Sequence, residues 1–165
     1  YASIALVTLA LPGADLPELS GLLAPATEGT LLKASTFFTT KWSHLRRADG
    51  LALVRASLGR IGEEERLQRP ADALVGTAVV ELGRLLGRPL PAPVDAGVRR
   101  WGGALPQYRP GHADRIAAAR AGLAAAHPTL ALAGAAYDGV GIPACIRSGQ
   151  TAADAVLKSL GDRRD

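Results

Sequence analysis

The sequence predicts an α+β chain, in which an antiparallel sheet with one helix is followed by a helix–strand–helix unit. Three stretches, 2–11, 29–39 and 51–59, are rich in Val, Leu, Thr and Phe and are separated by clusters of Gly, Pro and Asp, as strands are. An apolar stripe of helical period covers 70–86. Beyond residue 105 the pattern changes to two helices around a short apolar strand, which is typical of an α/β unit.

The stretch 51–59 has the most regular strand pattern in the chain. Apolar side chains occupy every second position: Ala52, Val54, Ala56 and Leu58. Arg55 and Ser57 fall on the opposite face, as the two-residue period of a strand requires. This pattern predicts a half-buried antiparallel strand.

A helix is expected from Pro70 to Leu86, because proline suits the first helical position and Gly87 suits the position after the end. The segment 63–69 before it is highly charged and is expected to be a solvated connector. Three prolines make 88–93 a stiff extended linker, and 94–102 is the next expected strand.

The second half begins after residue 104, and we expect two parts, 1–104 and 105–165. The later part contains an expected helix at 112–126, a short buried strand at 129–133 and, after a glycine-rich loop, a helix from Pro143 to Leu160. A strand, a glycine turn and a helix in this order are the layout of an α/β nucleotide-binding unit.

Composition excludes several classes of protein. The net charge of +4 is spread along the chain without a basic run, and aromatic residues make up only 4%, so a nucleic-acid partner is not expected. No apolar run is long enough for a transmembrane helix. The single cysteine, Cys145, excludes an intramolecular disulfide and fits a reducing cytoplasm, where a packed thiol is its expected role. Because the chain has no methionine, we expect it to be a piece of a longer protein.

Metal and nucleophilic sites are not predicted. The three histidines lie far apart without ligand spacing: His44, His112 and His127. Ser148 lacks the G-x-S-x-G setting of a catalytic serine. No catalytic acid or base is therefore named, and no metal ligand.

The stretch from Leu130 to Ala153 is the most informative part of the sequence. Gly134 would end the buried strand and let a ligand approach the backbone, and Gly139 and Gly141 would allow a tight turn. Pro143 would open the helix, so the free amides of its first turn and the helix dipole form a site for an anion or an electron-rich ring oxygen. The alternative is an ordinary strand–helix turn.

The same loop also matches the dinucleotide fingerprint G-x-G-x-x-A at 139–144. That fingerprint requires a complete βαβ unit and an acidic residue about 20 positions later. The acidic residue near that distance, Asp162, follows the last helix, and no second strand comes after it. We therefore interpret the match as accidental.

The loop and the preceding segment 100–112, Arg-Trp-Gly-Gly-Ala-Leu-Pro-Gln-Tyr-Arg-Pro-Gly-His, resemble the C-terminal third of the protoporphyrinogen and coproporphyrinogen oxidases. These enzymes belong to the flavin-containing amine oxidoreductase superfamily. Segments 21–37, 41–42 and 53–60 agree with the same family in order and spacing. The resemblance thus covers nearly the whole chain.

The resemblance implies that 105–165 is the C-terminal part of an FAD-binding domain. The family's loop at the start of the last helix meets the flavin through backbone amides, and its Arg-Trp motif places an aromatic side chain near the cofactor. The cofactor-binding residues expected on this basis are Trp101, Gly134, Gly139, Val140, Gly141 and Ile142. For Trp101 the alternative is a core-packing tryptophan.

The resemblance likewise makes 1–104 the C-terminal part of a substrate-binding domain, whose sheet would roof the flavin. Leu22 and Leu23 would contact a tetrapyrrole substrate, or else pack in the core. Arg55 or Lys33 would bind a propionate carboxylate by a charge-assisted hydrogen bond, or else lie solvated at an edge.

The implied activity of the whole protein is the six-electron oxidation of protoporphyrinogen IX or coproporphyrinogen III to the porphyrin in haem biosynthesis, with dioxygen as acceptor. Composition favours coproporphyrinogen. The family's N-terminal G-x-G-x-x-G is absent from this sequence, so we expect the chain alone to bind FAD weakly or not at all and to be inactive. Two alternatives are another flavin amine oxidoreductase, of amine oxidase or carotenoid desaturase type, and a non-catalytic interaction module. Oligomeric state and peripheral membrane contact stay open.

Overall fold

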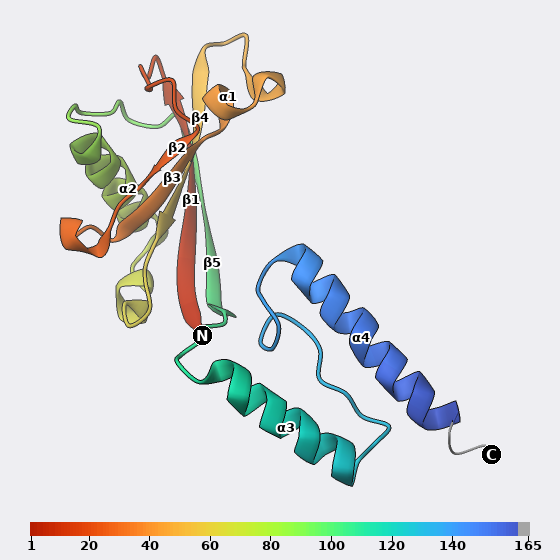
Figure 1. Cartoon of the computed structure of the whole chain (residues 1–165). Helices are drawn as coiled ribbons and strands as arrows, with labels where there is room; N and C mark the ends of the chain where they lie inside the picture. The colour runs from red at the N-terminus through yellow and green to blue at the C-terminus, as the bar shows by residue number, and fades with distance from the viewer. Residues whose placement is uncertain (162–165) are drawn as a thin grey trace. The chain divides into compact units, whose positions relative to one another are not determined.

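A computed structural model describes residues 1–161 and divides the chain into two compact units, Tyr1–Ala104 and Leu105–Asp165. We call these the sheet unit and the helical unit; residues 162–165, which the sequence placed in the second part, lie outside the described residues. The elements that begin in the sheet unit are β1 (Ala2–Pro12), β2 (Gly21–Leu23), β3 (Leu32–Phe37), α1 (Phe38–Lys41), β4 (Leu51–Leu58), α2 (Ala71–Leu85) and β5 (Asp95–Leu105) (Figure 1). The helical unit contains α3 (His112–Ala126) and α4 (Ile142–Gly161).

The five strands form one sheet in the order β2-β3-β4-β1-β5. β1 and β4 pair antiparallel from Ala5 opposite Leu58 to Pro12 opposite Leu51, and β3 pairs antiparallel with both β2 and β4. At the start of β2 only glycine fits, because a Cβ on Gly21 would lie 2.0 Å from the carbonyl oxygen of Ser35. The predicted α+β class with an antiparallel sheet is confirmed.

Helix α2 covers one face of this sheet, as Figure 1 shows. The alternating apolar side chains predicted for 51–59 are buried on that face, and the helix buries Leu74, Ala78 and Leu82 against them. The helix ends in a Schellman motif: the N–H of Arg88 donates to Gly83 O at 3.0 Å, and Gly87 has a φ of 70°. The predicted helix and its glycine stop are confirmed, with Pro70 as the capping residue before the first turn.

Within the sheet unit, the opposite face of the sheet is not covered by α2, and the short helix α1 contributes only Phe38 beside Arg55 there. Because residues alternate along strands, Arg55 of β4 lies on this face, together with Thr8, its partner on β1. On β5, Val98 packs against the core and Arg100 Nε donates to the carbonyl oxygen of Leu67, which is buried. Arg99, between them, therefore points to the uncovered face. We call this the free face of the sheet.

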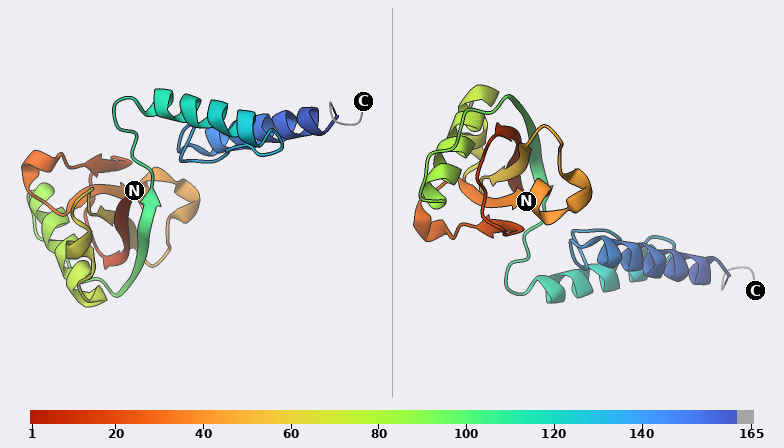
Figure 2. Two further views of the ribbon diagram at one scale, coloured as in Figure 1. Left: turned by 90° about the horizontal axis from the view of Figure 1, so that it is seen from below. Right: turned by 90° about the horizontal axis from the view of Figure 1, so that it is seen from above.

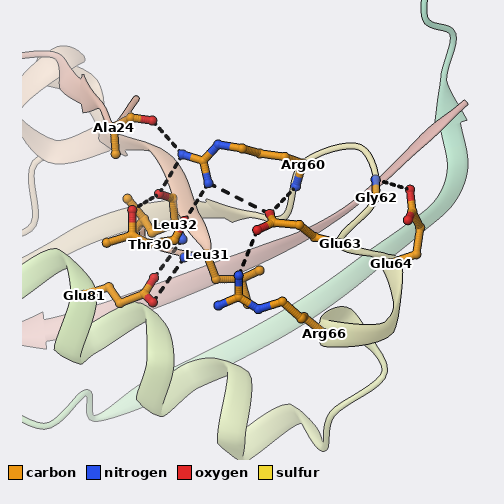
Figure 3. A network of polar contacts seen from close by, with 10 residues as sticks. All are labelled: Ala24, Thr30, Leu31, Leu32, Arg60, Gly62, Glu63, Glu64, Arg66 and Glu81. Carbon is orange, nitrogen blue, oxygen red and sulfur yellow. Dashed lines mark hydrogen bonds and ion pairs between the residues drawn. The ribbon is translucent and has the colours of Figure 1, made fainter. Parts of the chain in front are cut away.

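Arg60 ties the hairpin loop between β2 and β3 to the end of β4. Its guanidinium donates to Thr30 O at 2.6 Å and to Ala24 O at 2.7 Å, while its own backbone N–H donates to the Glu63 carboxylate at 2.8 Å (Figure 3). The connector at 63–69 contains a short 3₁₀ turn at Glu64–Leu67, and its charged side chains are exposed or half exposed, as predicted. Leu67 is the exception, because this apolar side chain is buried in the core.

Glu81 of α2 joins the helix to the same loop. Its two carboxylate oxygens accept the backbone N–H groups of Leu31, at 3.2 Å, and Leu32, at 2.7 Å (Figure 3). These amides lie in buried residues, so a carboxylate partner satisfies groups that would otherwise be costly to bury. Helix and sheet are thus joined by polar contacts as well as by apolar packing.

In the helical unit, α3 and α4 lie side by side, and the segment between them runs back along both (Figure 2). Both predicted helices are confirmed. The strand predicted at 129–133 is wrong: the segment carries no strand pairing, and Leu130 is 56% exposed. An apolar run becomes a strand only with a neighbouring strand to pair with, and none lies beside it among residues 105–161. Gly134 consequently follows an exposed segment and not a buried strand.

Replacing Arg60 by lysine should destabilise the sheet unit by about 1–3 kcal/mol, because the single ammonium nitrogen lacks the rigid two-nitrogen fork that reaches the carbonyl oxygens of Thr30 and Ala24 separately. Both tryptophans, Trp42 and Trp101, lie in this unit, so tryptophan fluorescence during urea unfolding reports on it selectively. The matched control is Arg66→Lys, since Arg66 is half exposed and, within residues 1–161, pairs only with Glu63. A loss of stability in Arg60→Lys no larger than in the control would contradict the assigned role.

Candidate functional site

The loop between α3 and α4 is organised around the carboxylate of Asp138. Arg120 of α3 donates to its two oxygens at 2.7 and 2.6 Å, and the Ser148 hydroxyl of α4 donates at 2.6 Å. Hydrogen bonds from Arg120, and then from Ser148, hold the pKa of Asp138 down at about 2. We call these three residues the Asp138 staple, because they join both helices to the loop.

The staple also fixes the beginning of the loop. Ser148 Oγ accepts the backbone N–H of Gly134 at 3.0 Å, and Arg120 donates to Leu132 O at 3.2 Å. Among residues 105–161, Ser148 is the one buried side chain. The buried position of this unit is therefore occupied by the polar hydroxyl of Ser148, which both accepts and donates a hydrogen bond, and not by an apolar side chain.

Tyr108 holds the later part of the loop. Its hydroxyl donates to Ala135 O at 2.5 Å and accepts the N–H of Gly139 at 2.6 Å. The phenol ring stacks on His112, with ring centroids 4.0 Å apart. Positioned by these contacts, Gly139 takes a φ of 129°, which residues with a side chain rarely adopt.

The backbone after Gly139 presents unpaired donors. The N–H of Cys145 donates to Gly141 O at 3.0 Å, so Gly141 immediately precedes the first turn of α4. Within residues 1–161, no hydrogen bond uses the N–H groups of Val140, Gly141 or Ile142. Three free amides at the positive end of a 20-residue helix suit an electron-rich oxygen. The side chain of Ile142 is 78% exposed.

The sequence-predicted cofactor residues fall into two places. Gly134, Gly139 and 140–142 are together in the loop of the helical unit. Trp101 lies on β5 in the sheet unit and is 49% exposed, so it does not pack in the core of that unit. Alternation along β5 places it on the free face, as it does Arg99. Contact of any of these residues with a cofactor stays a prediction.

The predicted substrate residues also separate. Leu22 packs against the core, whereas Leu23 is 84% exposed and, from its pairing with Ala34, lies on the free face. Arg55 lies on that face as well, its guanidinium carbon 5.2 Å from the centre of the Phe38 ring. Lys33 is half buried, and burial, followed by the nearby Arg60, lowers its pKa. Their contact with a substrate stays a prediction.

The sequence did not single out Arg120, Asp138 or Tyr108. An aspartate directly before a loop glycine is a recognisable signal, because such residues often order a turn through their side chain. Its arginine partner lies 18 positions earlier on another helix, and no local pattern indicates that pairing. Ser148, which was not expected to be a nucleophile, has a structural role in the loop.

Residues 1–161 contain neither a cluster of potential metal ligands nor a helix able to span a membrane. No three His, Cys, Asp or Glu side chains gather in a group that could hold a metal ion. None of the helices in this part of the chain has both the length and the apolar character needed to cross a membrane.

The fold and this loop define a chain of the flavin containing amine oxidoreductase family: the model of that family matches residues 1–157, and the chain belongs to it. Membership implies a flavin cofactor. The free N–H groups of the loop are suitable donors to an oxygen atom of such a cofactor.

Among its relatives, a coproporphyrinogen III oxidase of Mycobacterium tuberculosis (strain H37Rv) is 44% identical over 96% of this chain and 34% of its own length. One of Bacillus subtilis (strain 168) is 30% identical, with the same coverage. A crystal structure from Exiguobacterium sp. 255-15, of a protein provisionally named protoporphyrinogen oxidase, superposes with a TM-score of 0.80 at 31% identity, covering 95% of this chain and 35% of the other. The chain spans about a third of the length of the curated relatives it matches.

Replacing Asp138 by asparagine should loosen the loop without unfolding the helices. The asparagine side chain has one acceptor oxygen and no charge, so it cannot accept both Arg120 hydrogen bonds as the carboxylate does. Backbone hydrogen exchange at Gly134 and Gly139 should therefore become about two- to fivefold faster, which corresponds to the roughly 0.5–1 kcal/mol typical of half-exposed ion pairs. The matched control is Asp154→Asn, an exposed position on α4. Equal exchange in both variants would refute the staple.

The effect of Asp138→Asn should also depend on pH. The folded-state pKa of about 2 lies below the ordinary 3.8, so the stabilisation is present above about pH 5 and is lost as pH falls through 4 toward 2. The difference in exchange between wild type and variant should therefore shrink across that range. A difference that stays constant down to about pH 2 would show that the carboxylate charge is not responsible.

Proposed function

We propose that the complete polypeptide containing this chain is an FAD-dependent porphyrinogen oxidase. It would convert coproporphyrinogen III, or protoporphyrinogen IX, to the porphyrin in a six-electron oxidation with dioxygen as acceptor, as a step of haem biosynthesis in the cytoplasm. The observation that carries the proposal is the row of free N–H groups at 140–142, in a chain whose relatives are named as oxidases of these two substrates.

The chain's part in cofactor binding follows from the loop. The amides of Val140, Gly141 and Ile142 donate to the carbonyl-bearing edge of the flavin ring, and the start of α4 stabilises negative charge there. FAD supplies the redox chemistry when bound. The Asp138 staple and Tyr108 keep the amides in position beforehand, so that little order has to be gained on binding.

The free face of the sheet unit is the proposed surface for the tetrapyrrole. It carries Arg55, Leu23 and Trp101, which offer a positive charge and apolar surface to a flat macrocycle with carboxylate substituents. The chain's residues orient this substrate and exclude water from it. None of them is assigned a proton-transfer role.

The exposed apolar residues of the helical unit support the proposal that this unit completes a larger flavin-binding domain. They include Leu130, Val140, Ile142, Ile146, Leu157 and Leu160. A groove of about 300 Å³ lies among α3, α4 and the segment between them, and most of its lining is apolar. Such surfaces are expected to be covered in a folded protein.

A chimera tests the function directly. In it, this chain replaces the matching third of the Mycobacterium tuberculosis relative, to which it is 44% identical. We expect the purified chimera to retain FAD and to develop porphyrin fluorescence from coproporphyrinogen III, with hydrogen peroxide formed in proportion. The unaltered relative, prepared in the same way, is the positive control.

The chimera can contradict the proposal in two ways. A folded, FAD-containing chimera that oxidises only amines or polyenes would assign the chain to another branch of the family. A folded chimera that retains no flavin would reject the cofactor role of the loop. Should the chimera not fold, co-expression of the chain with the remaining part of the relative provides the same two readouts.

The role of the free amides can be tested with one pair of substitutions. Ile142→Pro deletes the N–H at the first residue of α4, where proline is well tolerated, whereas Ile142→Ala keeps the N–H and removes the side chain. In the chimera, we expect the proline variant to lose about tenfold in FAD affinity and the alanine variant to retain it, since one hydrogen bond to a charged edge is lost only in the former. Equal affinity in both would show that this amide does not contact the flavin.

A further inference from the structure

The free face of the sheet contains a hollow of about 440 Å³ with two arginines in its lining. Arg55 of β4 and Arg99 of β5 line it, together with Leu6 and Thr8 of β1 and Phe38 of α1. All of these residues belong to the sheet unit. Among residues 1–161, no acidic side chain lines the hollow, so the two positive charges have no counter-charge there.

Arg55 is held in one orientation with part of its donor capacity unused. Its guanidinium lies over the Phe38 ring, with 5.2 Å between Cζ and the ring centre. Its Nε is enclosed, and among residues 1–161 it has no hydrogen-bond partner. An enclosed donor without an acceptor is costly, and it indicates a group that the folded chain itself does not supply.

Arg99 is exposed and likewise forms no ion pair within the described residues. The neighbouring Arg100 behaves differently, because its side chain donates to the carbonyl oxygens of Leu67 and Arg69 on the covered side. Arg60 and Arg120 likewise donate to carbonyl or carboxylate partners within the chain. Arg55 and Arg99 are thus two arginines that share one hollow and, in the part of the chain described, lack an intramolecular acceptor.

We propose that Arg55 and Arg99 form a clamp for a propionate carboxylate of the porphyrinogen substrate. This inference rests on the proposed function and names the substrate contact within it. The planar guanidinium fork matches a carboxylate, the Thr8 hydroxyl adds a third donor, and Leu6 and Phe38 offer an apolar wall to the methylene groups of the propionate. Because one residue separates Arg99 from Trp101 on β5, both lie on the same face, and the clamp adjoins the predicted aromatic contact.

The test uses Arg55→Gln and Arg99→Gln in the chimera, with coproporphyrinogen III and its tetramethyl ester as paired substrates. We expect each variant to raise KM for the free acid about tenfold with little change in kcat, because a charge-assisted hydrogen bond to bound substrate is lost. KM for the ester should not change, because the ester has no carboxylate to bind. Arg55→Lys should fall between, since it keeps the charge and loses the fork.

Arg46→Gln is the matched control: it removes the same charge from an exposed position outside the hollow and should leave KM unchanged. Arg99 is exposed, so its variant reads out the clamp even if Arg55→Gln fails to fold. An equal rise in KM for acid and ester, or no rise for either, would overturn the clamp.

Two further outcomes distinguish the carboxylate clamp from a phosphate site and from a failure of the proposed function. Competition by inorganic phosphate that disappears in Arg99→Gln while KM for the acid stays unchanged would assign the hollow to phosphate groups and overturn the carboxylate clamp. A wild-type chimera that oxidises neither the acid nor the ester would instead contradict the proposed function itself.

Discussion

The two-residue alternation of side chains along the sheet determines what each of its faces can do. Every second residue of β4, from Ala52 to Leu58, is buried against the α2 side, and this packing supplies the core of the sheet unit. The intervening residues then necessarily point the other way, toward the free face, which α2 does not cover. The proposed substrate contacts are placed on the free face because α2 fills the other. The position of Arg55 is a consequence of core packing and not an independent feature.

The loop of the helical unit is held by hydrogen bonds between its polar groups. Among residues 105–161 no apolar side chain is fully buried, and the loop is ordered by hydrogen bonds to Asp138, Ser148 and Tyr108. These bonds use the backbone groups of Gly134 and Gly139 and leave those of 140–142 unused. The same network that fixes the loop thus determines which amides remain available to a ligand. Because the order comes from polar contacts between distant residues, local sequence patterns do not reveal how the loop is held.

The sequence predicted correctly those secondary-structure elements that depend on local periodicity. The helix at 112–126, the strand at 51–58 and the glycine stop at Gly87 follow from repeating patterns and turn chemistry, and the structure has them. The strand at 129–133 was wrong because pairing depends on a neighbour that an apolar run cannot specify. The Asp138 staple could not be foreseen, since its members come from two helices and the loop between them and meet only in the folded unit. At the candidate site the loop itself was located from its glycines, while the contacts that hold it were not.

The two units therefore place different demands on their proposed ligands. A flavin edge is rigid and needs donors that are fixed before it arrives, which hydrogen-bonded backbone amides provide. A propionate is a flexible substituent, and it is better bound by side chains that project from a rigid sheet and can adjust. Substitutions on the free face should consequently alter which substrate binds without disturbing the core, because the side chains there take no part in it. In the proposed oxidase, cofactor binding and substrate choice would then be separable in sequence, one depending on backbone geometry and the other on side-chain identity.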